Sequence, residues 1–423
     1  MNPKSVLAVD DIHLGTPEFW TLPHEEREGA FQTLRRERPI SFHPEVEFGP
    51  FPPGRGFWAL ARHADIMYAG THPKTFCSGK GATSIPDLPV EFLEFFGSMI
   101  NMDDPRHGRL RRLVSIAFTA RQLGRVEEDV KKRATRVLDR VIEQGSCDFV
   151  TEIAAPLPIG IICDMLGIPE SQHSFVFDQT NIILGGSDPE YVADIDALGP
   201  ALLAAGAALA ELMNELRRDR LAKPTDDLTS ALVHAEIDGD RLSEQDMASF
   251  FILLVAAGNE TTRNSISHGM KALCDFPEQR QIWMQDFAAV TPTAVEEIVR
   301  FASPVIFMRR TATSDAEIGG RKVREGDKLI LFYNSGNRDE DVFAEPYRFD
   351  VRRDPNEHVG FGGGPHFCLG AELARREIRI LFHELFTRLP DLEIVGEPER
   401  LLSPFINGVK HMQCRFTPGR RSA

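Results

Sequence analysis

One long proline-free stretch constrains the fold of this 423-residue chain more than any other feature. Ser243 and Asp246 have the spacing of a capping box, in which Ser caps free N–H groups and the acid reaches back. From there the pattern predicts one helix to about Cys274, on the order of 45–50 Å long at about 1.5 Å per residue. Its middle, FFILLVAAGNETT, is apolar on all sides. Such a helix passes through the centre of a protein, so other elements must pack around it.

The rest of the chain is predicted to be mainly α with a smaller β part. Residues 105–300 have a helical pattern broken at Pro and Gly, and residues 303–333 alternate and turn like short strands. A further helix is predicted from about Leu369 to Leu389. The length favours two domains or one large layered domain. Because no change of composition marks a boundary, we expect a single domain over residues 1–423.

Composition and charge exclude several classes of function. A formal net charge of −15 argues against binding to nucleic acid or to an anionic membrane. The N-terminal residues lack the features of a signal peptide, and no window approaches the roughly 20 apolar residues of a membrane span. We therefore expect a soluble, cytoplasmic protein. The six cysteines include no C-x-x-C pair, so paired zinc or iron–sulfur ligands are not expected.

The segment FGGGPHFCLG, residues 361–370, predicts a ligand site around one cysteine. It fails both G-x-G-x-x-G and the P-loop pattern, and nothing at suitable spacing completes a zinc site with His366 and Cys368. A cysteine nucleophile stays open, although crowded glycines suit a flat ligand better. A helix beginning near Leu369 would direct free N–H groups at the sulfur and favour its thiolate. The chemistry fits haem, with Cys368 as the axial ligand of the iron.

The spacing of this segment resembles the signature F-x-x-G-x-H-x-C-x-G of the cytochrome P-450 family. Phe361 is expected to shield the sulfur, Gly364 to let the backbone approach the ring, and His366 to reach a haem propionate. The resemblance covers about residues 11–417. It implies the family's fold, a triangular, mainly α prism with a small β region. Haem b (iron-protoporphyrin IX) then lies between the long central helix and the helix that follows Cys368.

The middle of the long helix resembles the family's oxygen-activation motif. Gly258 in a helix interior costs about 1 kcal/mol relative to Ala, so a reason is needed. Ala257 and Gly258 would leave room for a diatomic ligand, and Thr261 lies one turn from Ala257 on the same face. The resemblance implies that Thr261 hydrogen-bonds O2 and that Glu260 supplies protons. The alternative is a close-packed crossing of helices.

Two further matches involve charged residues. Glu297 and Arg300 form the family's E-x-x-R at i, i+3 spacing, and the resemblance implies a buried structural pair. His107 and Arg111 lie one turn apart on a predicted helix that holds the haem propionates in the family. Arg310 is similar to another arginine that binds a propionate.

The resemblance implies a monooxygenase whose electrons arrive from outside, because the chain carries no flavin or iron–sulfur motif. Arginines on the two helices that should flank the thiolate suggest a basic face for an acidic ferredoxin, itself reduced by a ferredoxin reductase. Solvated charge is the alternative. The arginines are Arg106, Arg109, Arg112, Arg375, Arg376 and Arg379.

Within the family the chain is similar to mycobacterial lipid and sterol hydroxylases, the methyl-branched-lipid ω-hydroxylases in particular. The stretches SFFILLVAAGNETTRN, TAVEEIVRFASPVIFMRRT and ARREIRILF carry that likeness. It implies hydroxylation of a terminal methyl, with branched fatty acids, isoprenoids and sterol side chains all open. Rival interpretations are a macrolide or terpene monooxygenase, a peroxygenase, and a haem sensor without turnover. The residues expected to line the substrate tunnel are Phe96, Met99, Ile100, Leu253, Ala256, Val305, Ile306 and Phe405.

Overall fold

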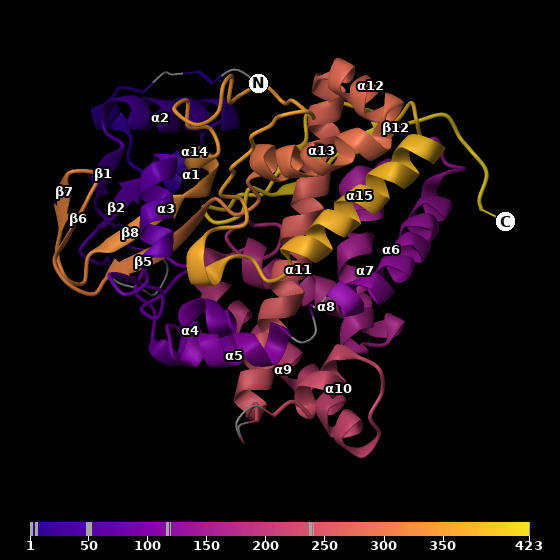
Figure 1. The fold of residues 1–423 in the computed structure, drawn as a ribbon, viewed down its shortest axis with the longest axis horizontal. Helices are drawn as coiled ribbons and strands as arrows, with labels where there is room; N and C mark the ends of the chain where they lie inside the picture. Colours follow the sequence, from indigo (N-terminus) through magenta and orange to yellow (C-terminus); the bar gives the residue numbers. More distant parts are fainter. Residues whose placement is uncertain are drawn as a thin grey trace.

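The structure is a computed structural model that describes residues 3–4, 7–47, 53–115, 118, 120–236, 239 and 241–422. A helical part surrounds one long central helix, and a smaller β part lies on one side of it (Figure 1). This agrees with the predicted mainly α fold.

The helices of eight or more residues are α2 (His24–Glu37), α3 (His63–Thr71), α4 (Val90–Gly97), α5 (Arg106–Ser115), α6 (Ala120–Val141), α7 (Pro156–Leu166), α8 (His173–Gly185), α9 (Leu198–Ala222), α11 (Glu244–Asp275), α12 (Pro277–Gln285), α13 (Phe287–Ala302) and α15 (Ala371–Arg388). The shorter ones are η1 (Val9–Asp11), α1 (Pro17–Thr21), η2 (Ser98–Asn101), η4 (Phe149–Ala154), η5 (Glu170–Gln172), η6 (Ile195–Ala197), α10 (Leu228–Val233), α14 (Tyr333–Gly336) and η7 (Gly364–His366).

The central helix is α11, and the predicted capping box forms at its start. The Ser243 hydroxyl accepts from the Asp246 N–H at 3.0 Å, and the Asp246 carboxylate accepts from the Ser243 N–H at 3.3 Å. Most of its residues are buried, and α4, α7, α8, α9, α13 and α15 all pack against it. Because it has neighbours on every side, its apolar middle is buried all round, as the sequence predicts.

The β part is a five-stranded sheet of order β1-β2-β8-β5-β3 with three smaller sheets. Only the β2–β8 pair within the large sheet is parallel among the described residues. The strands predicted within residues 303–333 are all present, which confirms that interpretation. The strands are β1 (Ile40–His43), β2 (Phe57–Leu60), β3 (Phe76–Cys77), β4 (Ser146–Asp148), β5 (Phe307–Ala312), β6 (Ala316–Ile318), β7 (Arg321–Val323), β8 (Lys328–Phe332), β9 (Glu393–Ile394), β10 (Glu399–Arg400), β11 (Val409–His411) and β12 (Gln413–Arg415).

Two helical stretches have the length and apolar composition of a membrane span, Phe149–Leu166 and Ile195–Ala222. This corrects the expectation that no window approaches that length. The expectation overlooked the contribution of Ala, which is frequent in α9. In the first stretch 72% of the apolar window is buried inside the fold, against 28% in the second. The first is therefore a core element, while α9 covers α11 and α8 and leaves much of its own surface open.

Candidate functional site

The loop before α15 folds back on itself and fixes the position of Cys368. The Cys368 N–H donates to the Phe361 carbonyl at 2.9 Å, and the Phe367 N–H donates to the Gly364 carbonyl at 3.1 Å. Gly364 has a φ of +66°, and a Cβ there would collide with the Gly70 carbonyl oxygen of α3. The structure therefore explains this glycine by the close approach of α3.

The surroundings of Cys368 act on its thiol in two opposite directions, and burial has the larger effect. Burial raises the pKa of the Cys368 thiol, whereas the N–H groups of Gly370 and Ala371 and the charges of Arg111 and Arg375 lower it. The two N–H groups belong to the start of α15, as the sequence predicts. The side chain nevertheless has accessible surface, so it opens onto a hollow within the protein. No group of three His, Cys, Asp or Glu side chains among the described residues is placed to hold a metal ion.

Arg375 supports this loop, a role that the sequence analysis missed. Its guanidinium lies 4.7 Å from the centroid of the Phe361 ring and pairs with Glu296 at 2.6 Å. His358 contacts the same carboxylate at 3.0 Å, and together these charges lower the pKa of Glu296 to about 2 despite its burial. The position of Arg375 in the second turn of α15, the helix that follows Cys368, was the available signal.

Four predicted propionate ligands lie close together, from three separate segments. The rings of His107 and His366 are 4.2 Å apart, and the Arg111 guanidinium donates to the Phe367 carbonyl at 2.6 Å. Burial, and next the charges of Arg310, His107 and Arg111, lower the pKa of His366 to about 3. Among the described residues, nothing accepts from or donates to the buried Nε2 atom of His107. This cationic group therefore fits a ligand with carboxylates, as haem has.

The midpoint of α11 has accessible surface on one face only. Ala257 is exposed and Thr261 is partly exposed, although both lie between buried residues of a helix in the protein interior. That surface must therefore border an internal hollow. The Thr261 hydroxyl donates to the Ala257 carbonyl at 2.7 Å. Gly258 differs from the expectation, because a Cβ there would point at Ile162 of α7, 3.5 Å away, rather than share the face of Ala257.

Glu260 lies in a buried polar network beneath α8. It pairs with Arg263 one turn later and accepts from Asn264 at 3.0 Å, while Arg263 donates to Asn181 at 3.1 Å. The sequence analysis missed Arg263, whose i, i+3 spacing from Glu260 repeats that of Glu297 and Arg300. Within the described part of the chain, three buried atoms of this network have no partner: Asn259 Oδ1, Glu260 Oε2 and Arg263 Nε. Buried polar atoms of this kind are usually satisfied by ordered water.

Glu297 and Arg300 form the predicted buried pair on α13. Both side chains are fully buried, and their closest atoms are 2.7 Å apart. Arg300 also donates to the carbonyls of Asn337 and Pro346, and Glu297 accepts from Arg353 at 3.1 Å. The pair therefore fixes the irregular chain that leads to the Cys368 loop, which agrees with a structural role.

The residues expected to line a substrate tunnel fall into two groups. Phe96, Met99 and Ile100 pack in one apolar cluster with Leu253 of α11, next to buried Ala256, and Phe96 also meets Gly206 of α9. The second group lies at a corner of the sheet. There the Ile306 N–H donates to the Phe405 carbonyl at 2.8 Å, and Val305 bridges to Ile406. Ile306 is buried among core residues, so its side chain is part of the core.

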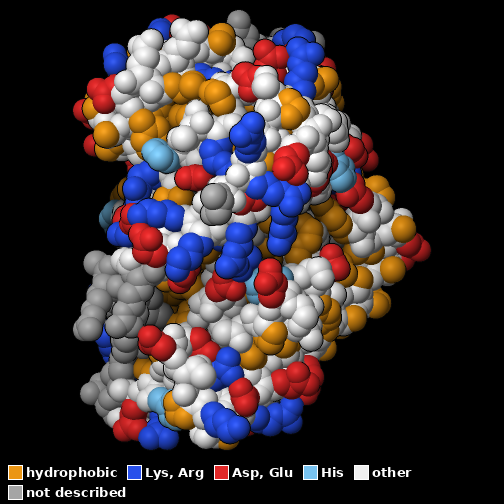
Figure 2. Space-filling view, turned by 90° about the vertical axis from the view of Figure 1, so that its right-hand side faces the viewer, with side chains coloured by type: hydrophobic (Ala, Val, Ile, Leu, Met, Phe, Trp, Pro, Cys, Tyr) orange, Lys and Arg blue, Asp and Glu red, His pale blue; other side chains and the backbone are white. Residues whose placement is uncertain are grey.

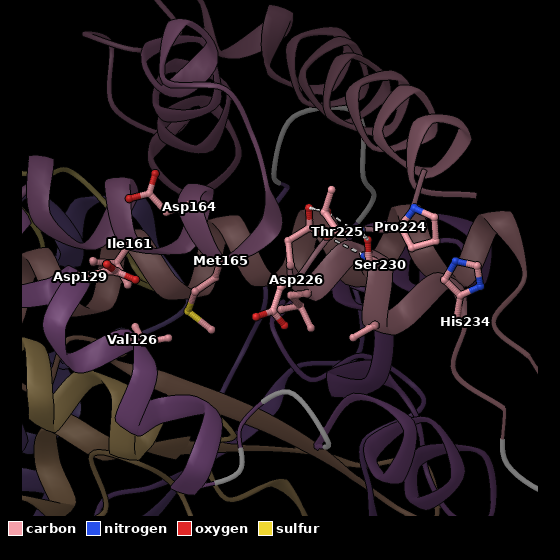
Figure 3. Close-up of a pocket in the computed structure, with 13 residues that line it drawn as sticks. Val126, Asp129, Ile161, Asp164, Met165, Pro224, Thr225, Asp226, Ser230 and His234 are labelled. Carbon is pink, nitrogen blue, oxygen red and sulfur yellow. Dashed lines mark hydrogen bonds between the residues drawn. The ribbon is translucent and has the colours of Figure 1, made fainter. Parts of the chain in front are cut away.

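A separate surface pocket of about 430 Å³ lies between α6, α7 and the chain around α10 (Figure 3). None of the predicted site residues lines it. Two of its carboxylates already hold arginines: Asp164 pairs with Arg133 at 2.5 Å and Asp227 with Arg220 at 2.5 Å. The negative charge of these two carboxylates is therefore already neutralised by arginines.

The proposed basic face is less basic than its arginines suggest. Arg376 and Arg379 both reach Glu127 of α6, at 2.9 and 3.0 Å, and Arg106 pairs with Glu94 at 2.6 Å. Figure 2 shows the side with α6 and α15, where Lys and Arg side chains gather across the middle with Asp and Glu among them. This corrects the expectation, because the sequence count included the cations of two helices and omitted carboxylates from the neighbouring elements.

Comparisons with known proteins agree with this geometry. The family model for cytochrome P-450 matches residues 204–390. The methyl-branched lipid omega-hydroxylase of Mycobacterium tuberculosis (strain H37Rv) is 52% identical, over 98% of this chain and 97% of that protein. The steroid C26-monooxygenase of Mycolicibacterium smegmatis is 38% identical, over 94% and 91%. A Mycobacterium marinum cytochrome P-450 in complex with pseudoionone superimposes with a TM-score of 0.92 at 44% identity, covering 98% of this chain and 100% of that one. The chain therefore belongs to the cytochrome P-450 family of monooxygenases.

Proposed function

We propose that this chain hydroxylates the terminal methyl group of a methyl-branched lipid, using O2, haem b and electrons from a ferredoxin. The observation that carries the choice of substrate is the 52% identity, over nearly the whole of both chains, to a methyl-branched lipid omega-hydroxylase. Branched fatty acids and isoprenoids both have such methyl groups.

Cys368 is the residue that holds the iron in this proposal. The N–H groups of Gly370 and Ala371 and the charge of Arg111 stabilise its thiolate. His107, Arg111, Arg310 and His366 face the two propionates, which would give the unpartnered Nε2 atom of His107 an acceptor. When bound, the haem supplies the chemistry that activates O2 and transfers one oxygen atom to the substrate.

Thr261 and Glu260 provide the protons in this proposal. The Thr261 hydroxyl lies on the open face of α11 and donates to the Ala257 carbonyl, so it would be placed to hold a proton beside the haem. Glu260 lies on the buried side, in the network with Arg263. Water at the unpartnered atoms of that network would connect Glu260 to Thr261, so protons reach the site without opening it to bulk solvent.

The choice of a terminal C–H bond is a matter of position. A terminal methyl has the strongest C–H bonds of an alkyl chain, so the protein must hold it nearest the oxygen. The apolar cluster of α4, η2 and α11 borders the middle of α11 and is the proposed wall of the tunnel. Phe96 and Ile100 are its partly buried members with side chains left to contact a ligand.

The electron donor in this proposal is a ferredoxin that docks beside α15. The arginines there are largely paired with carboxylates of this chain. We therefore expect carboxylates of the ferredoxin to replace these partners at the interface, and the long-range electrostatic attraction to be weak. A steroid side chain is the second candidate substrate, favoured by the 38% identity to a steroid C26-monooxygenase.

Spectral titration of the purified ferric protein tests the substrate. A methyl-branched fatty acid, an acyclic isoprenoid and cholest-4-en-3-one are added separately, and the shift from low to high spin is recorded. A tight shift with a branched lipid, followed by a product oxidised only at the terminal methyl, supports the proposal. A tight shift with the sterol alone favours the second candidate. If none of the three changes the spectrum, lipid hydroxylation is contradicted while haem binding is unaffected.

A further inference from the structure

A small cavity lies between α2, α11 and the chain around Arg338 and Arg400, and it shares no residue with the site at Cys368. Its volume is about 30 Å³. A single water needs roughly 10–15 Å³, so the cavity holds about two waters or one monatomic ion. Its lining is strongly polar and includes His24, Glu28, His268, Arg338, Tyr347 and Arg400.

Two of the acids that line this cavity are already neutralised. Glu25 pairs with Lys4 at 2.7 Å, and Asp275 pairs with Lys271 at 2.6 Å. The remaining acid is Glu28, whose Oε2 atom is 3.9 Å from Arg338 Nε, too far for a hydrogen bond. Of the described acids that line the cavity, Glu28 therefore has the longest ion pair.

Three arginines meet at this point and keep donors free. Arg338 lines the cavity and is 7% exposed, and Arg27, which is 9% exposed, lies close enough to lower the pKa of Arg400. Arg400 completes the group from the strand β10. In the described part of the chain, Arg27 Nε, Arg338 Nε, Arg400 Nη1 and Glu28 Oε2 have no hydrogen-bond partner. Such an accumulation of unpaired buried donors is costly unless something accepts from them.

The net charge of the group is positive at neutral pH. Burial lowers the pKa values of Arg338 and Arg400 to about 10 each, so both stay charged. Burial, and next the charge of Arg400, lowers the pKa of His268 to about 3 and that of His24 well below its usual value, so both histidines are neutral. Arg27, Arg338 and Arg400 thus lie near Glu28, while Glu397 also acts on Arg400, and Asp275 and Glu297 already pair with other cations. Water would satisfy the free donors without offsetting this charge.

We propose that this cavity binds one chloride ion between Arg338 and Arg400. The ion accepts from Arg338 Nε and Arg400 Nη1, and Lys271 and the Glu28 carboxylate lie on the same lining. Arg338 also donates to the carbonyls of Arg300 and Phe301, at 3.3 and 2.8 Å. The ion would therefore join α2, β10 and the end of α13, and its role is structural.

Bromide replacement in crystals of the haem-loaded protein tests this directly, because bromide gives an anomalous signal. We expect one anomalous peak within contact distance of Arg338 Nε and Arg400 Nη1. Water density at that position with no anomalous peak would overturn the proposal. This measurement uses the unaltered protein, so it does not depend on whether a variant folds.

Thermal unfolding in sodium chloride and in sodium gluconate, at equal ionic strength, provides a second readout. At chloride about five times Kd, linkage predicts an upward Tm shift of about 1 °C for a chain of this length. Arg400→Gln should lose the chloride response. Arg415→Gln is the matched control, because Arg415 is exposed and forms a surface ion pair with Glu393, and it should keep the response. Equal Tm values for the unaltered protein in both salts, or an undiminished response in Arg400→Gln, would contradict chloride binding.

Discussion

Both carboxylate oxygens of Glu297 contact the guanidinium of Arg300, at 2.7 Å to Nε and 2.8 Å to Nη2, and neither side chain is exposed. One of these oxygens also accepts from the Asp350 N–H at 2.9 Å. The pair thus connects α13 to the irregular chain before Cys368. An ion pair so deeply buried is stable only while both partners are present.

Glu297→Gln should therefore destabilise the protein strongly. Removing one partner of a buried pair costs about 3–5 kcal/mol, because the other charge stays in the interior. We expect a lower Tm and a lower haem content after purification. Glu393→Gln removes the partner of exposed Arg415 and should leave both unchanged. Similar effects of the two substitutions would show that the Glu297–Arg300 pair is dispensable.

Gly258→Ala should be tolerated. A Cβ at this position would lie 3.5 Å from Ile162, an ordinary contact, and Ala stabilises a helix interior by up to about 1 kcal/mol relative to Gly. Ala257→Leu, its neighbour, should instead obstruct the open face of α11 and weaken binding of carbon monoxide to the reduced protein. Carbon monoxide titrations of both variants compare the two positions. If Gly258→Ala lost carbon monoxide binding and Ala257→Leu kept it, the hollow would lie on the face of Gly258, which would contradict the account.

Glu260→Gln should lower turnover by about 100-fold, the lower end of the range for a positioned proton donor. Its side chain keeps its size and can still accept from Asn264, but its buried ion pair with Arg263 is lost, so the fold should be weakened and turnover is measured per haem-loaded protein. The turnover and its solvent isotope effect, measured with a chemical or surrogate electron donor, test this. Thr262→Ser, on the same turn of α11, is the control. Unchanged turnover in Glu260→Gln would remove this residue from the proton path.

Acid should destabilise the fold through His43. Its Nδ1 accepts from the Leu14 N–H at 3.4 Å, its Nε2 contacts Ser41 Oγ at 2.8 Å, and burial lowers its pKa to about 4. Above about pH 6.5 His43 is neutral in both the folded and the unfolded state, so it does not change the free energy of unfolding. Between pH 6.5 and about 4 only the unfolded state gains the proton, so stability falls by at most about 1.4 kcal/mol per pH unit. His43→Gln should flatten this slope in denaturant titrations, and an unchanged slope would contradict the assignment.

The sequence was sufficient for features that depend on local spacing. The capping box of Ser243, the i, i+3 pair of Glu297 and Arg300, and the N–H groups behind Cys368 all involve residues within one or two turns. Features that depend on distant segments were missed or misjudged. The sequence around Arg376 does not show that Glu127 pairs with it, and the sequence around Gly364 does not show its contact with α3. Such contacts arise only once the helices pack.

The central claim is that Cys368 is the thiolate ligand of a haem iron. The most direct measurement is the absorption spectrum of the reduced protein with carbon monoxide, for the unaltered chain and for Cys368→Ala. Cys163→Ala is the control, since this cysteine is fully buried in the core around α7. We predict the red-shifted Soret band of a thiolate-ligated complex in the unaltered protein and in Cys163→Ala, and its loss in Cys368→Ala. A band that survives in Cys368→Ala, or that is missing from the haem-loaded unaltered protein, would contradict the account.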